Sequence, residues 1–300
     1  MLETGRPLPI PYRAKIVLPL GLAAISFASV FIKLCEAPPL VICAYRLGIA
    51  GLILVLFNFR PLRRELGVLT RREIFLALLA GLFLSLHFAF WITSLKYTSV
   101  ASSVIFVTTN PIFVSLASVL FLRERLSLSL FFSILVAVIG GLLIGWSDWG
   151  AGNQTVYGDF LALLGAVMAT GYLLAGRRLR PKMSLGPYIT LVYGAAGVVL
   201  ILFAFVNEDS FFGYSSKDYL LFLLLALIPQ LIGHTTVNWA LRFFSATLVA
   251  VIILGEPVLA TLLAFLLLAE PVGPNILLGG TLVLIGIYLS AREERKLTAS

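Results

Sequence analysis

Charged residues are scarce in this chain of 300 residues. Asp, Glu, Lys and Arg make up 12% of it, against roughly 25% in an ordinary soluble domain. Hydrophobic residues reach 60%. This composition excludes an ordinary soluble protein and indicates one that crosses a membrane several times. No segment has the composition of a separate soluble domain.

Cysteine and histidine are also rare, which narrows the chemistry. The two cysteines, Cys35 and Cys43, are too few for a disulfide framework and lack metal-ligand spacing, so we expect them to pack. Two histidines argue against an intramembrane metalloenzyme. His-Glu-x-x-His, Gly-x-Ser-x-Gly and phosphate-loop motifs are missing from the sequence. We therefore expect no enzyme, no metal site and no cofactor.

Long apolar stretches dominate what is present. Each is close to the roughly 20 residues that a helix needs to cross the hydrocarbon core. The sequence predicts an all-α membrane protein with ten transmembrane helices at 15–32, 39–57, 74–95, 100–120, 128–146, 157–176, 185–206, 219–240, 246–268 and 275–291. No cleavable signal peptide is apparent, so we expect the first span to be retained.

The 22 Lys and Arg residues give a net charge of +8, and their distribution explains it. With a cytoplasmic N-terminus, 18 of them fall in inner segments, and only Lys33, Lys96 and Lys217 fall in outer ones. This bias predicts that both termini are cytoplasmic. The charge is thus a topology signal, and we expect the lipid bilayer, not nucleic acid, as the partner. We expect a multi-pass protein of a bacterial or archaeal inner (plasma) membrane.

The chain also repeats itself. A shift of 146 residues places Ser99 on Ser245, Pro111 on Pro257, Glu124 on Glu270 and Gly140 on Gly286. We therefore divide the chain into repeats at 1–147 and 148–300. Because each repeat holds five spans, an odd number, the second enters the membrane from the opposite side. Inverted repeats of this kind build the central site of many secondary carriers.

Two charged residues lie near the middle of predicted spans, where a charge costs roughly 2.5 to 3.5 kcal/mol even on the mildest scale. They are Arg46 in the second span and Glu256 in the ninth, at similar depth. One interpretation is a structural ion pair that locks the halves together. In a second, Glu256 takes a proton or a substrate ammonium while Arg46 takes a carboxylate or tunes Glu256. In a third, Arg46 snorkels outward and acts with neither.

Two prolines, Pro111 and Pro257, also lie mid-span, directly after Asn110 and Glu256. Proline removes a backbone donor and frees a carbonyl, so we predict helix kinks there. Kinks that face each other at mid-membrane would suit a binding site. Helix bending for packing explains the prolines equally well.

Further polar side chains lie in the third and eighth spans. Gln230, His234 and Asn238 are spaced by four residues and form a polar stripe that should face a cavity or another helix. His87 and Trp91 lie one turn apart, suited to gripping an aromatic or amphipathic solute. Alternatively, His87 hydrogen-bonds to a neighbouring helix and Trp91 packs as an interfacial aromatic.

The fifth and tenth spans have almost no polar side chains and are rich in glycine, so we expect them to pack outside any solute path. Gly141 and Gly145 form a weak dimerisation signal, and we expect a monomer or a weak dimer.

Several segments resemble the EamA repeat of the drug/metabolite transporter superfamily, over nearly the whole chain. In the first half these are Leu86-His87-Phe88-Ala89-Phe90-Trp91-Ile92-Thr93-Ser94-Leu95-Lys96-Tyr97-Thr98-Ser99, Asn110-Pro111-Ile112-Phe113, Leu122-Arg123-Glu124-Arg125-Leu126-Ser127 and the arginine motif Tyr45-Arg46-Leu47. In the second half they are Glu256-Pro257-Val258 and Leu268-Ala269-Glu270.

The resemblance implies a ten-helix carrier of two inverted five-helix repeats, with a central cavity and the fifth and tenth helices outside it. Similar proteins export amino acids and other small metabolites, and some relatives move nucleotide sugars, triose phosphates or lipid-linked sugars. Because Arg46 is the only cation expected at the cavity, sugar phosphates fit poorly. Glu256 belongs to the family pattern, so it marks either the fold or a coupling site.

The sequence therefore predicts an alternating-access exporter of small zwitterionic or amphipathic solutes, amino acids above all, with proton exchange as a hypothesis. The predicted substrate-binding residues are Arg46, His87, Trp91, Asn110, Gln230, His234, Asn238 and Glu256, and Glu256 is also the candidate for coupling. A flippase or carrier for lipid-linked or other amphipathic solutes, opening laterally, is the alternative. A membrane receptor or scaffold would usually need longer loops.

Overall fold

The computed structural model describes residues 11–117, 120–121, 127–145, 153–269 and 273–299. The predicted repeat pair Glu124 and Glu270 lies outside these residues, as do Arg6, Arg123 and Arg125. The described ranges contain helices and no strands: α1 (Ala14–Leu34), α2 (Pro39–Leu66), α3 (Arg71–Ser94), α4 (Val100–Val107), α5 (Asn110–Ala117), α6 (Leu128–Gly145), α7 (Asn153–Leu179), α8 (Leu185–Val206), α9 (Ser216–Leu225), the π-helix η3 (Ala226–His234), α10 (Thr235–Ala240), α11 (Ala246–Ile253), α12 (Glu256–Leu268) and α13 (Pro274–Ala299).

Eight spans of this bundle are long and apolar enough to cross a membrane. The apolar parts of α6 and α13, Leu128–Leu143 and Leu277–Leu289, are shorter. The all-helical fold and the multi-pass character expected from the composition are thus confirmed for the described residues.

Three predicted spans differ from regular helices. The fourth divides into α4 and α5 and the ninth into α11 and α12, so Pro111 and Pro257 each lie at the second position of a new helix, directly after Asn110 and Glu256. Proline tolerates this place because the first residues of a helix donate no intrahelical hydrogen bond. The eighth span is continuous but widens into η3 around Pro229, which cannot donate to the preceding turn.

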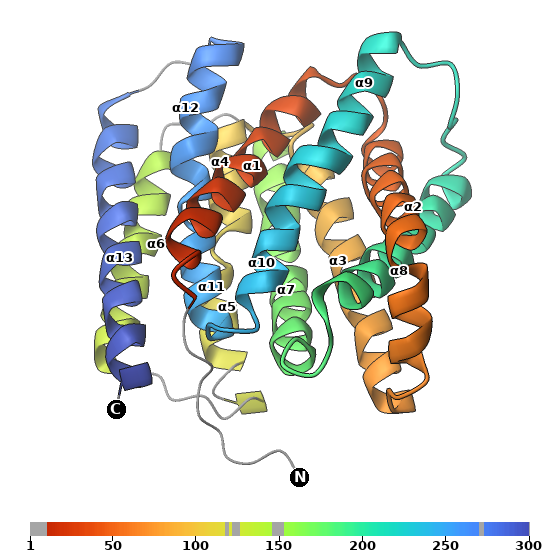
Figure 1. Cartoon of the computed structure of the whole chain (residues 1–300). Helices are drawn as coiled ribbons and strands as arrows, with labels where there is room; N and C mark the ends of the chain where they lie inside the picture. The colour runs from red at the N-terminus through yellow and green to blue at the C-terminus, as the bar shows by residue number, and fades with distance from the viewer. Residues whose placement is uncertain (1–10, 118–119, 122–126, 146–152, 270–272, 300) are drawn as a thin grey trace.

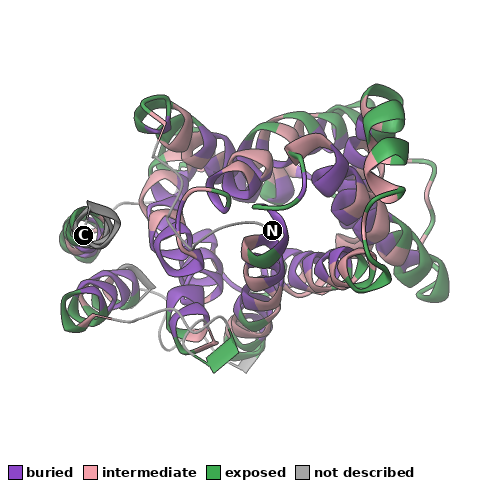
Figure 2. Cartoon of the chain, turned by 60° about the horizontal axis from the view of Figure 1, so that its bottom comes forward, coloured by how far each residue is buried: buried purple, intermediate pink, exposed green. Residues whose placement is uncertain are grey.

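The helices pack as pairs that are distant in sequence. α2 packs on α8, α3 on α7, and α6 on α13 (Figure 1). The α6/α13 pair lies at one edge of the bundle, while buried residues concentrate among the remaining helices (Figure 2). A Cβ on Gly140 would lie 2.5 Å from the carbonyl oxygen of Gly279, and a Cβ on Gly286 would lie 2.5 Å from Cβ of Ala137. Glycine therefore permits the close approach of this pair.

The first glycine of the proposed dimerisation motif, Gly141, is buried and faces Ile105 within the same chain. It therefore lies against α4 and not on the outer surface of the bundle.

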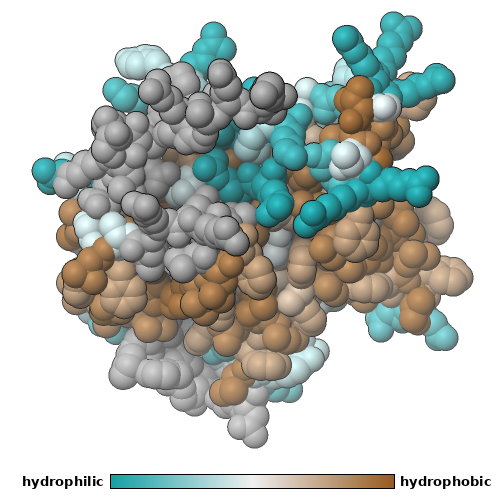
Figure 3. Space-filling model, turned by 90° about the horizontal axis from the view of Figure 1, so that it is seen from below, coloured by the Kyte–Doolittle hydropathy of each residue, from teal (hydrophilic) through white to brown (hydrophobic). Residues whose placement is uncertain are grey.

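The C-terminal end of α2 and the N-terminal end of α3 lie at the lower end of the bundle in Figure 1. Exposed arginines there include Arg60, Arg63 and Arg64 of α2 and Arg71 and Arg72 of α3. Seen from this end, hydrophilic side chains extend beyond a largely hydrophobic body (Figure 3). The C-terminal ends of α2, α7 and α13 all lie on this side (Figure 1).

Candidate functional site

A cavity of about 490 Å³, open solvent at its mouth included, lies in the middle of the bundle. Helices α1, α3, α4, α5, α7, η3, α10, α11 and α12 all contribute to its wall. The polar lining consists of His87, Trp91, Thr108, Asn110, Tyr172, His234 and Glu256, and the apolar lining of Ile25, Val107, Ala169, Leu173, Val237 and Ile253.

Two matched helix breaks position the polar groups of this wall. Ser99 caps α4 by accepting from the Ser102 amide, and Ser245 caps α11 by accepting from the Leu248 amide. Each helix is eight residues long and ends at a turn, after which Asn110 begins α5 and Glu256 begins α12. The two breaks are 146 residues apart, as the repeat predicts. They bring an amide and a carboxylate to the same cavity.

The prolines that follow also affect the cavity wall. In a continuous helix, the carbonyls of Val107 and Ile253 would accept from residues 111 and 257, which are prolines and have no N–H. Val107 and Ile253 both line the cavity. The predicted freed carbonyls therefore belong to residues of the site, and they too are 146 residues apart.

The position of His87 is compatible with both interpretations, a hydrogen bond to a neighbouring helix and a place beside Trp91 in the solute site. Its Nδ1 lies 2.9 Å from the Gly165 carbonyl oxygen of α7, which can only accept, so Nδ1 carries the proton and Nε2 is left as an acceptor. The same side chain lines the cavity beside Trp91, with ring centroids 6.1 Å apart and planes 14° from parallel. The ring of His234 lies 6.5 Å from that of His87. Both histidines of the chain thus share one cavity.

Arg46 lies outside the cavity wall and is fully buried. Its Nε donates to Oε1 of Gln230 at 2.9 Å, and its guanidinium lies 4.0 Å from the centre of the Phe88 ring. Phe88 in turn meets His234 edge to face, with centroids 5.1 Å apart. The possible ion pair between Arg46 and Glu256 is not formed in the described structure. Similar depth along the membrane normal does not fix which way two side chains point.

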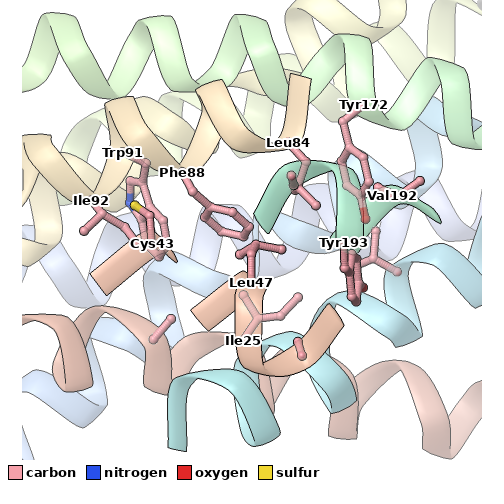
Figure 4. Packing of buried hydrophobic residues seen from close by; sticks show 14 of the residues in the cluster. Ile25, Cys43, Leu47, Leu84, Phe88, Trp91, Ile92, Tyr172, Val192 and Tyr193 are labelled. Carbon is pink, nitrogen blue, oxygen red and sulfur yellow. The ribbon is translucent and has the colours of Figure 1, made fainter. Parts of the chain in front are cut away.

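Asn238 ties this buried layer to the cavity. Its Nδ2 lies 2.6 Å from Oη of Tyr172, 3.0 Å from Oη of Tyr193 and 2.9 Å from the His234 carbonyl oxygen. Figure 4 shows the two tyrosines close together, and Phe88 and Trp91 projecting from α3 toward α2. Asn238 therefore positions Tyr172, which lines the cavity, and does not line it itself.

Several buried polar atoms around the cavity have no hydrogen-bond partner among the described residues. They include both Nη atoms of Arg46, Nε1 of Trp91, Oδ1 of Asn110, Nε2 of Gln230 and Nδ1 of His234. An unsatisfied buried group costs about 1 to 3 kcal/mol. Such groups around one cavity are typical of a site that is completed by water or a ligand.

Five of the eight predicted binding residues therefore line one cavity: His87, Trp91, Asn110, His234 and Glu256. Arg46, Gln230 and Asn238 form the buried layer behind it. Tyr172 and Thr108 also line the cavity and were not among the predicted residues. No signal set Tyr172 apart in the sequence, because it lies four residues from the end of the predicted span 157–176, where tyrosines are common. No group of three or more His, Cys, Asp or Glu side chains that could hold a metal ion occurs among the described residues.

Comparison with known proteins decides the family. The model of the EamA-like transporter family matches residues 15–146 and again residues 156–292. The chain belongs to the EamA-like transporter family. It is therefore a membrane transporter, and the resemblance in its motifs is confirmed.

Two relatives agree with this assignment, and a solved structure shares the fold. The chain is 28% identical to the pseudopaline exporter CntI of Pseudomonas aeruginosa over 71% of this chain and 72% of the exporter. It is 25% identical to the uncharacterized transporter YdfC of Bacillus subtilis over 93% and 92% of the two chains. A protein crystal structure superposes with a TM-score of 0.76 over 96% of this chain and 99% of the other, at 20% identity.

Proposed function

We propose that this EamA-family transporter exports an amino-acid-like zwitterion from the cytoplasm through the central cavity by alternating access. In this proposal, residues 1–147 and 148–300 are inverted repeats that rock around the cavity. Both termini are cytoplasmic, and the protein resides in the inner (plasma) membrane of a bacterium or archaeon.

Residue pairs 146 positions apart support the two-repeat arrangement. Trp91 with Val237, Val107 with Ile253, and Asn110 with Glu256 all line the cavity. Phe88 and His234 form a fourth such pair and contact each other directly. A site built from equivalent positions of two repeats is what alternating access around a central axis requires.

One observation carries the substrate class: the cavity region holds a carboxylate and a guanidinium that do not pair with each other. Glu256 lines the cavity, and the unpartnered Oδ1 of Asn110 adds an acceptor at the equivalent helix break. This side suits an ammonium group. The unpartnered Nε1 of Trp91 is a donor, and Arg46 adds positive charge behind Phe88. A zwitterion would complement both sides, whereas a sugar phosphate would meet too few cations.

Glu256 would bind the ammonium group or exchange a proton for it. We expect Glu256→Gln to lower amino-acid counterflow in proteoliposomes at least tenfold, because the amide keeps the size of the side chain and removes its charge. Glu208→Gln is the matched control, since Glu208 is exposed outside the spans and should tolerate the same change. The measurement is uptake of labelled amino acid into vesicles loaded with unlabelled amino acid.

Counterflow that Glu256→Gln leaves intact would remove Glu256 from the site without removing the carrier assignment. If folded, inserted native protein exchanges no amino acid, the proposed substrate class is wrong. Lipid-linked or other amphipathic solutes would then be tested next.

A further inference from the structure

A second, smaller cavity, of about 280 Å³ with open space included, adjoins the central one. It is bounded by α1, α10 and α11, and we name it the side chamber. Its wall consists of Leu18, Gly21, Leu22, Ile25, Thr236, Val237, Ala240, Val249, Ile252 and Ile253. Only Thr236 carries a polar side chain in this set. The side chamber therefore differs sharply in chemistry from the central cavity.

The two cavities share a wall. Ile25, Val237 and Ile253 line both of them, one from each of α1, α10 and α11. Three aliphatic side chains thus border both the polar central cavity and the side chamber. A solute anchored by its polar end in the central cavity would direct an attached group past these residues.

The local packing shows why space remains here. A Cβ on Gly21 would lie 2.4 Å from Cγ2 of Thr236, so only glycine lets α1 approach α10 this closely. Around this contact, Leu18, Leu22 and Ile252 are only partly buried, whereas Val249 is 2% exposed. The helices meet at Gly21, and the chamber lies beside that contact.

We propose that the side chamber binds the side chain of the transported amino acid and selects substrates with aliphatic or aromatic side chains. This inference rests on the proposed function, because the polar groups of the central cavity must hold the ammonium and carboxylate. An apolar side chain would exchange water for apolar contacts on entering. A charged side chain would lose its hydration without gaining a partner, so aspartate and lysine would be rejected.

The test narrows the chamber and compares two substrates. In Val249→Phe, the larger side chain occupies space in the side chamber, and position 249 does not line the central cavity. We expect the KM for leucine counterflow to rise about tenfold, the scale on which pockets sense added or missing methylene groups. The KM for alanine should change less than twofold, since its methyl group would not reach the chamber.

Two further variants control for packing. Leu20→Phe makes the same addition on the exposed face of α1, where Leu20 is 61% exposed, and should leave both KM values unchanged. Ile252→Ala enlarges the chamber and should lower the KM for phenylalanine relative to that for alanine. These opposite shifts keep the inference testable if Val249→Phe folds poorly.

Equal changes for leucine and alanine, or no change for either, would overturn the side-chamber proposal while leaving the carrier intact. Lysine or aspartate exchanged as well as leucine by the native protein would overturn it too. If the native protein exchanges no amino acid, the proposed function itself fails, and the side-chamber inference fails with it.

Discussion

Arg46 shows how a cation can be fully buried in this fold without a direct ion pair among the described residues. Its Nε is fixed by Gln230, and its flat guanidinium lies over the Phe88 ring. Stacking of this kind is attractive because the ring face is electronegative, and it is worth about 2 kcal/mol when desolvated. The same contacts place the charge next to Phe88, whose ring contacts His234 of the cavity wall. Arg46 therefore lies behind the cavity and does not line it.

We expect Arg46→Lys to behave as a severe substitution although it keeps the charge. Lysine cannot supply the planar Nε donor to Gln230 or stack as a guanidinium does. Loss of the charged hydrogen bond should lower stability by about 1 to 3 kcal/mol, measured by thermal unfolding in detergent. Counterflow should fall with it. Arg72→Lys, at an exposed position of α3, is the control. Native behaviour of Arg46→Lys would show that only the charge matters.

The helices show what could be predicted from the sequence and what could not. The spans follow from hydropathy, and proline chemistry predicts kinks at Pro111 and Pro257, where the structure has full helix breaks. The π-helix at Ala226–His234 could not be predicted from hydropathy, because the same apolar residues are compatible with an α-helix and with a π-helix. The depth in the membrane, estimated from position within a span, likewise did not show that Glu256 lines the cavity while Arg46 lies behind Phe88. The direction in which a side chain points around its helix axis depends on how the neighbouring helices pack.

At the α6/α13 contact, we expect Gly140→Ala and Gly286→Ala each to lower stability by about 1 to 3 kcal/mol, because the added methyl group overpacks a closed interface. Gly194→Ala is the matched control, since a Cβ there meets nothing within 4 Å. Thermal unfolding checks the prediction. Counterflow per folded molecule should stay within about twofold of the native rate, because neither helix lines the cavity. A large loss of transport without a loss of stability would contradict this.

For the whole molecule, the distribution of cationic side chains predicts how the protein is oriented in the membrane. The exposed arginines of α2 and α3 share one end, and Lys217 at the start of α9 lies at the other (Figure 1). The positive-inside rule predicts that the arginine-rich end faces the cytoplasm.

We expect a membrane-impermeant maleimide to label Lys217→Cys in intact cells, and Arg72→Cys only after permeabilisation. Both positions are exposed. The native thiols should give little background: Cys43 is fully buried, and burial raises the pKa of the Cys35 thiol to about 12, which keeps it protonated at neutral pH. The unsubstituted protein measures that background. The reverse labelling pattern would invert the proposed orientation.

The pairing of Asn110 with Glu256 also limits the energetics of the proposed cycle. Of these two equivalent positions, only Glu256 can release a proton, so exchange there is limited to one proton per solute. A zwitterion leaving against one entering proton moves one net charge inward. A membrane potential of 100 mV contributes about 2.3 kcal/mol per charge, and 1.4 kcal/mol corresponds to a factor of ten. The potential alone would then sustain a roughly 40-fold outward solute gradient.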